Sequence, residues 1–149
     1  MTWKGVVIHH SASPDAPGVD AEMFRVWHQA RGWRDIGYHF IVEKVGQFYE
    51  VVAGRPLWMV GSHCPGKNRT HLGVCLAGDF MVEGPPEEQL RLAASHVAGL
   101  VVAFGMGRDS VEPHHDAARP DRPTECPGDG FPWRTLMAEI DYYINKGEV

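Results

Sequence analysis

Residues 4–9, KGVVIH, contain Val6, Val7 and Ile8 in a row. The stiff β-branched side chains of these residues fit a pleated surface, so the segment predicts a short buried strand. The strand delivers His9 at its carboxyl end. Because a strand end is rigid, we expect it to be a good place from which to aim a ligating side chain.

Three more segments are predicted to be strands. Residues 36–43, IGYHFIVE, and 47–52, QFYEVV, flank Gly46, which indicates a hairpin. Residues 72–77, LGVCLA, are apolar on both faces, as in a central strand covered on both sides. The first of these strands alternates, which puts four residues on one face: Ile36, Tyr38, Phe40 and Val42.

A helix is predicted before the hairpin. Asp20 is its expected N-cap and Gly32 its stop. Phe24, Trp27 and Ala30 recur on one side of this helix, so we expect them to face the sheet.

Two further helices are predicted in the second half of the chain. One follows Pro85, carries apolar residues at helical spacing and ends at Gly105, and His96 falls outside its apolar stripe and is expected to face solvent. The other spans residues 132–146.

Residues 106–130 show no period, and a loop of this length usually has a function. The expected fold is a single α/β domain over residues 1–149, with a central mixed sheet flanked by helices on both faces.

The composition limits the classes of function. A chain of 149 residues with 44% hydrophobic and 22% charged residues is typical of one globular domain. Its net charge of −5 argues against a nucleic-acid partner. No run approaches the roughly 18 apolar residues of a membrane span, and no signal peptide is visible. We therefore expect a monomer without a membrane partner that is cytoplasmic when synthesised.

A widely separated set of residues has the chemistry of a metal centre. His9, His114 and Cys126 offer two imidazoles and one thiolate, which is a ligand set of hydrolytic zinc with a fourth position for water. The neighbours His10 and His115 leave this assignment open by one residue. On an extended backbone neighbouring side chains point opposite ways, so only one of each pair can reach a common metal.

Five segments occur in an order that resembles a known family: IHHSAS, WRDIGYHFIVEKVG, VGSHCPGKN, HLGVCLAGDF and PHHDAARPDRPTECPG. The chain resembles the zinc-dependent N-acetylmuramoyl-L-alanine amidases, in the group that contains the lysozyme-named amidase of phage T7 and the peptidoglycan recognition proteins. The resemblance runs from Val6 to Phe131, which is nearly the whole chain.

The resemblance implies a single Zn²⁺ held by His9, His114 and Cys126. It implies Tyr38 as an active-site tyrosine whose hydroxyl stabilises the tetrahedral oxyanion of amide hydrolysis. It also implies a role for Thr124, whose hydroxyl is too weak a base to abstract a proton but can orient the carbonyl, the leaving nitrogen or a water. The alternative for this threonine is a loop residue that bonds its own backbone.

Further residues are expected around the substrate. His63 matches a histidine near the family's substrate groove, and His10, Trp58, Arg55 and Asn68 are candidates for the same groove. Trp58 offers a flat face to a sugar, and Arg55 offers a partner for a carboxylate.

The chain departs from the family pattern in two ways. Some related amidases have a glutamate on the central strand where this chain has Cys75. That leaves the proton shuttle open among the zinc-activated water, Tyr38 and a nearby histidine. The interval from His114 to Cys126 is also longer than in the family pattern, which we expect to reshape the rim of the groove.

The expected function is hydrolysis of the amide bond between the lactyl group of N-acetylmuramic acid and L-alanine of peptidoglycan. The expected type is a phage or prophage endolysin that reaches the wall through a separate membrane pore. Three alternatives stay open: a non-catalytic peptidoglycan-recognition module, a cytoplasmic amidase that recycles muropeptides, and a regulator of another protein that uses the same fold.

Overall fold

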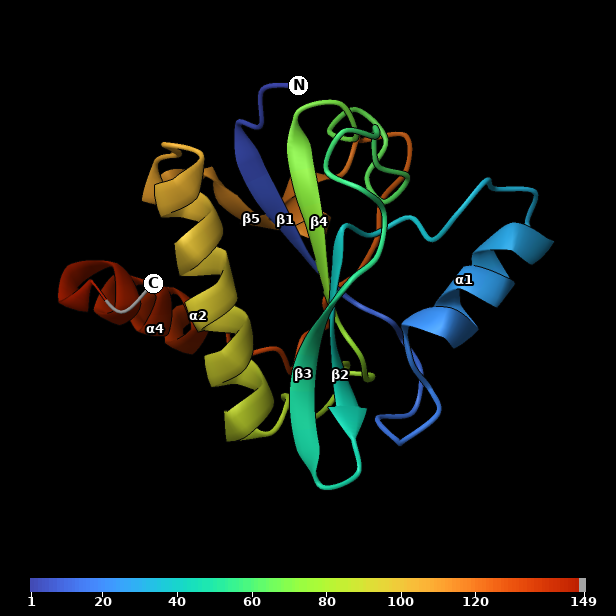
Figure 1. Cartoon of the computed structure of the whole chain (residues 1–149), viewed down its shortest axis with the longest axis horizontal. Coiled ribbons are helices and arrows are strands. Elements are labelled where there is room, and N and C mark those ends of the chain that lie inside the picture. The colour runs from blue at the N-terminus through green and yellow to red at the C-terminus, as the bar shows by residue number, and fades with distance from the viewer. Residues whose placement is uncertain (148–149) are drawn as a thin grey trace.

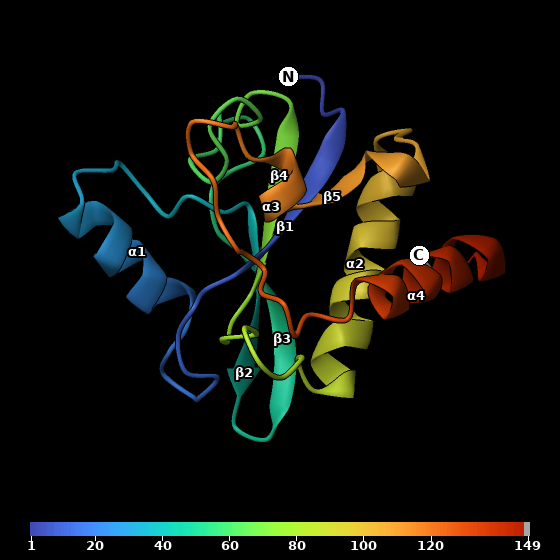
Figure 2. The same cartoon turned by 180° about the vertical axis from the view of Figure 1, so that it is seen from behind.

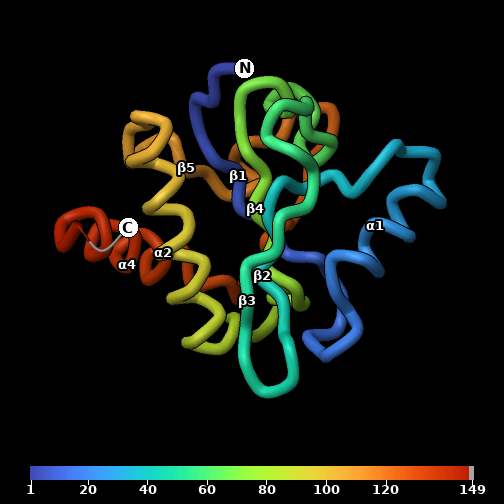
Figure 3. The backbone as a smooth tube through the Cα atoms, in the orientation of Figure 1, coloured from blue at the N-terminus to red at the C-terminus, as the bar shows by residue number. Residues whose placement is uncertain are grey.

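The computed structural model describes residues 1–147 and is built around one five-stranded mixed sheet in the order β3-β2-β4-β1-β5. Strand β1 (Gly5–His10) lies between β4 (His71–Leu76) and β5 (Val111–Pro113) and is parallel to both. Strand β2 (Phe40–Val45) is parallel to β4 and pairs antiparallel with β3 (Phe48–Ala53) in the predicted hairpin. Figure 3 shows β1 between β5 and β4, and β4 is the middle strand of the sheet.

Helices cover both faces of the sheet, as predicted (Figures 1 and 2). Helices α2 (Glu87–Ala103) and α4 (Trp133–Lys146) pack together on one side, and α1 (Ala21–Ala30) lies on the other. Helix α2 begins after two prolines and has two glutamates in its first turn. Their negative charge interacts favourably with the positive end of the helix dipole. Two short helices, a 3₁₀ turn (Arg108–Ser110) and α3 (His114–Ala117), flank β5.

The apolar core is divided by the sheet. The larger part lies between the sheet and helices α2 and α4, and includes Ile8, Leu76, Val97 and Ile140. A smaller cluster lies beneath α1. No helix within residues 1–147 is both long enough and apolar enough to cross a membrane.

The predicted face of α1 was partly wrong. Its buried residues are Ala21, Phe24 and His28, whereas Trp27 is 41% exposed and Ala30 is also exposed. Counted from Ala21, Phe24 is at i+3 and His28 at i+7, and these positions share one face of a helix. Trp27 is at i+6 and lies off that face.

The predicted alternation through residues 36–42 was also wrong. Strand β2 begins only at Phe40, and Tyr38 in the preceding irregular segment packs with Ile36 on the α1 side of the sheet. Phe40 and Val42 instead join the core on the opposite side. His96 was expected in solvent but lies half-buried against the Phe40 ring, with 4.3 Å between the ring centroids.

The long segment 106–130 has more structure than its sequence suggests. It contains β5 and α3, and β5 pairs with β1 in the register Ile8 to Pro113. This pairing brings the C-terminal part of the chain to the end of the strand that carries His9.

Candidate metal centre and active site

His9 and His114 meet because two parallel strands end at the same edge of the sheet. His9 is the penultimate residue of β1, and His114 follows the last residue of β5. Ile8 of β1 pairs with Pro113 of β5, so the residues that follow them, His9 and His114, lie at the same level of the sheet. The centroids of the two imidazole rings are 4.4 Å apart.

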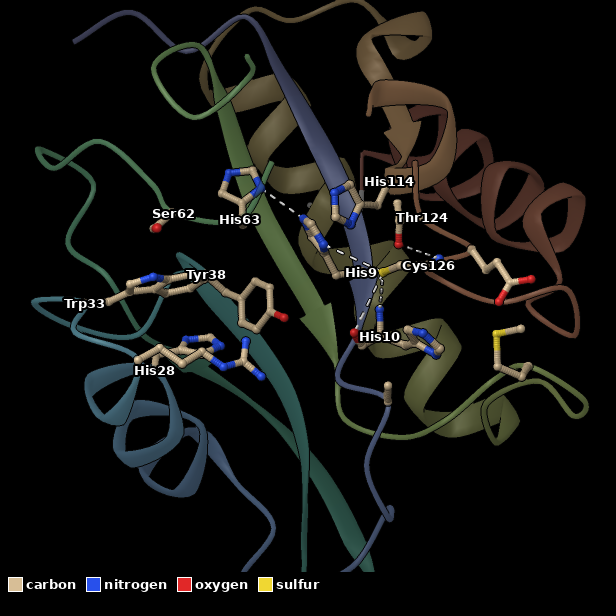
Figure 4. Close-up of a pocket in the computed structure, with 14 residues that line it drawn as sticks. His9, His10, His28, Trp33, Tyr38, Ser62, His63, His114, Thr124 and Cys126 are labelled. Atoms are coloured by element: carbon tan, nitrogen blue, oxygen red, sulfur yellow. Dashed lines mark hydrogen bonds between the residues drawn. The ribbon is translucent and has the colours of Figure 1, made fainter. Parts of the chain in front are cut away.

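Cys126 reaches the same place from the loop that follows α3. The main-chain N–H of His115 donates to the Cys126 carbonyl at 2.8 Å, which folds this loop back onto α3. The main-chain N–H of His10 donates to Cys126 Sγ at 3.4 Å. These contacts place Sγ 3.8 Å from Nδ1 of His9 (Figure 4).

The three side chains fit a metal ion. Each offers one ligand atom, and the three atoms lie within 4.8 Å of one another. Nδ1 of His114 is buried and has no hydrogen-bond partner within the described part of the chain, which is costly unless a ligand occupies it. Two imidazole nitrogens and one thiolate are a zinc donor set. Within the described residues this group contains His9 and His114 and not their neighbours His10 and His115, so its geometry favours the first histidine of each doublet.

Burial sets the protonation of these groups. It lowers the pKa of His9 well below its usual value, and it lowers the pKa of His114 to about 4. Both imidazoles are therefore neutral at pH 7, which is the form that binds a metal. Burial raises the pKa of the Cys126 thiol to about 12, so the thiol loses its proton only when a cation binds.

A cavity of about 490 Å³ opens over these ligands. The predicted site residues that line it, besides the three ligands, are Tyr38, Thr124, His10 and His63 (Figure 4). The structure therefore brings together residues from four separate parts of the chain.

Tyr38 stands across the cavity from His9, His114 and Cys126. Its ring centroid is 5.1 Å from that of His9, and Figure 4 shows its hydroxyl pointing toward the side on which the ligands lie. Burial and the neighbouring Cys75 thiol raise the pKa of Tyr38 well above its usual value. The phenol therefore keeps its proton and can donate a hydrogen bond into the cavity.

Thr124 lines the cavity and also bonds its own loop. Its Oγ1 accepts a hydrogen bond from the Cys126 main-chain N–H at 3.2 Å. The bond supports the loop position of Cys126, and it is the contact expected of the structural alternative for this residue.

Cys75 lies beneath the site. It pairs with His9 in the register of β1 and β4, so both side chains are on the same side of the sheet. Burial raises the pKa of the Cys75 thiol well above its usual value. The thiol is neutral and cannot replace a carboxylate as a base.

Two predicted groove residues lie elsewhere. Arg55 is 8% exposed, and its guanidinium donates to the main-chain carbonyls of Asp35, Ile36 and Val60. It joins loops together and is not free to bind a substrate carboxylate. Trp58 is 78% exposed and lines a different, apolar hollow that it shares with Arg55.

Asn68 has a structural contact. Its side-chain oxygen accepts hydrogen bonds from the main-chain N–H groups of His63 and Cys64, each at 2.8 Å. It fixes the loop that carries His63 and does not line the cavity.

Several cavity residues were missed from the sequence, of which His28 is the most informative. It lies beside Tyr38, with 5.4 Å between the ring centroids, and its Nδ1 accepts the Gly37 main-chain N–H at 2.9 Å. Its helical spacing from Phe24 was the available signal. The remaining cavity residues that sequence reasoning missed are Ala12, Arg31, Trp33, Ser62, Met81 and Glu125.

Comparison with known proteins agrees with the motifs and the fold. The family model described as N-acetylmuramoyl-L-alanine amidase matches residues 1–129. An endolysin of Klebsiella phage KP32 is 36% identical over 127 residues, which cover 82% of this chain and 78% of the endolysin. Peptidoglycan-recognition protein LB of Drosophila melanogaster is 33% identical over 144 residues, which cover 91% of this chain and 56% of that protein.

Among solved structures, the amidase LysC from Clostridium intestinale URNW superposes with a TM-score of 0.81 at 29% identity, covering 95% of this chain and 87% of LysC. The family match extends over most of the chain, and the fold is that of a solved amidase structure. The chain therefore belongs to the N-acetylmuramoyl-L-alanine amidase family.

Proposed function

We propose that this protein is a zinc-dependent peptidoglycan amidase of the endolysin type. Its substrate bond is the amide between the lactyl group of N-acetylmuramic acid and L-alanine of the stem peptide. The observation that carries this proposal is the convergence of His9, His114 and Cys126 in one cavity that Tyr38 also lines. We take the protein to act as a monomer.

The chemistry divides between the ion and the protein. His9, His114 and Cys126 would hold a single Zn²⁺, which supplies Lewis-acid chemistry that lowers the pKa of water and polarises a carbonyl. Tyr38 keeps its proton and donates to the oxygen that gains negative charge as the amide carbon becomes tetrahedral. Thr124 keeps the Cys126 loop in place.

Two other histidines that line the cavity, His10 and His28, can each donate a hydrogen bond through Nε2. Nδ1 of His10 accepts the Phe80 main-chain N–H at 3.0 Å, and Nδ1 of His28 accepts from Gly37. A neutral imidazole carries one proton, so each of these rings carries it on Nε2. They are suited to bind carbonyl oxygens of the substrate and not to abstract a proton.

The test of this function is release of stem peptides from purified cell walls. We expect release by the zinc-loaded protein, loss of release after chelation, and recovery when zinc is added back. Cys126→Ser should bind zinc poorly and release little peptide. Undiminished release by the chelated protein and by this variant would refute the proposal.

The endolysin type is supported by the KP32 phage relative, which matches most of the chain. We propose that the protein acts on the wall after passage through a separate pore. Intact walls and soluble anhydro-muropeptides, supplied at equal stem concentration, separate this role from recycling. A preference for the soluble fragments would point to a recycling amidase.

A further inference from the structure

His63 is held in a fixed position at the edge of the metal centre. Its side chain lies between Gly61 and Gly73, and a Cβ on either glycine would be 2.6 Å from an atom of the His63 ring. Its main-chain N–H is bonded to Asn68. Glycine at both positions makes room for an imidazole that is only 7% exposed.

The partners of His63 determine where its proton lies. Nε2 is 3.0 Å from the main-chain carbonyl oxygen of His71, which can only accept, so Nε2 carries the proton. With its proton on Nε2, Nδ1 is the nitrogen of His63 that can accept, and Nε2 of His9 lies 2.9 Å from it.

The position of the proton on His9 follows from its hydrogen bond to His63. Nε2 of His9 is 2.9 Å from the acceptor Nδ1 of His63, so His9 donates this hydrogen bond and carries its proton on Nε2. Nδ1 of His9 then has a free lone pair. Independently of any proton, the geometry shows that Nδ1 is the atom of His9 that faces Cys126 Sγ, at 3.8 Å.

We propose that His63 is a positioning residue that holds His9 in the tautomer and orientation needed to bind zinc through Nδ1. The proposal rests on the zinc centre of the proposed function. Partners that orient a ligating histidine through its other nitrogen also strengthen it as a ligand. Both ring nitrogens of His63 are already bonded, so this role replaces the substrate contact expected from its sequence motif.

The first experiment needs no variant. Long-range ¹H–¹⁵N spectra of the metal-free protein distinguish the two tautomers of His9. We expect the form with the proton on Nε2. A proton on Nδ1 of His9 would overturn the proposal.

The second experiment measures zinc affinity by competition with a chelator. His63→Leu removes both hydrogen bonds and should weaken zinc binding by about 10- to 100-fold. His63→Asn keeps an acceptor near the position of Nδ1 and should retain most of the affinity. His96→Leu, which also replaces a half-buried histidine but on the far side of the sheet, should bind zinc like the parent.

The outcomes separate this proposal from the function on which it rests. If the parent binds zinc and releases stem peptides while His63→Leu binds zinc equally tightly, only the positioning role is wrong. Equal losses in the His63→Leu and His63→Asn variants would likewise show that the acceptor on residue 63 does not matter. If the parent binds no zinc, the proposed function itself fails.

Discussion

Gly73→Ala should destabilise the protein and weaken its metal centre together. A Cβ at this position would lie 2.6, 2.7 and 3.0 Å from three atoms of the His63 ring, about 1 Å closer than ordinary van der Waals contact. The ring cannot turn aside, because Gly61 and two hydrogen bonds hold it from other directions. Overpacking of this kind costs about 1–3 kcal/mol.

In a domain of this size each kcal/mol lowers the melting temperature by about 2–4 °C, so the expected loss is about 2–12 °C. Gly99→Ala is the matched control, because Gly99 lies within α2 and a Cβ there meets nothing within 4 Å. Alanine in a helix interior should stabilise by up to about 1 kcal/mol. The two variants therefore shift the melting temperature in opposite directions.

Thermal unfolding of the metal-free proteins measures the first effect, and chelator competition measures the second. We expect weaker zinc binding for Gly73→Ala only, since the added methyl group displaces the partner of His9. If Gly73→Ala melted at or above the parent temperature and bound zinc as tightly, His63 would not be held in the way described.

Three further predictions concern the site and its surroundings. Tyr38→Phe should lower kcat by about 10²- to 10³-fold with little change in zinc affinity, as measured by stem-peptide release and chelator competition; an unchanged kcat would exclude the phenol as an oxyanion donor. Burial lowers the pKa of His39 from 6.5 to about 4, so the unfolded chain takes up a proton that the folded protein does not as the pH falls through this range. Urea unfolding of the metal-free protein should show stability falling with decreasing pH, with up to about 1.4 kcal/mol per pH unit from this residue, and His39→Asn should have the shallower slope. Zinc at 100 times its dissociation constant should stabilise the parent by about 2.7 kcal/mol, whereas Cys126→Ser should show little shift in a thermal melt.

The sequence was most informative where local pattern and buried position coincide. The apolar segments that became β1 and β4 were readable because a central strand is covered on both faces. Strand β5 could not be predicted from the sequence, because it has only three residues and ends in a proline. It is stabilised by its pairing with β1. Pairing between distant segments leaves no periodic signal in either one.

The site was partly predictable for similar reasons. The family motifs led to His9, His114 and Cys126, which composition and spacing alone could not have joined. Arg55 was misplaced because its partners are main-chain carbonyls, which every sequence offers. His28 was overlooked because the larger Trp27 beside it was taken for the buried residue.

The position of β1 between β4 and β5 also limits the order in which the sheet can assemble. Both of its neighbours, β4 and β5, are synthesised later, so β1 must wait for partners that are far away along the chain. Folding dominated by such distant pairing is slow compared with folding through local contacts. Cys126 is made after both histidines, so a nascent chain that ends before it lacks one of the three residues proposed to hold zinc.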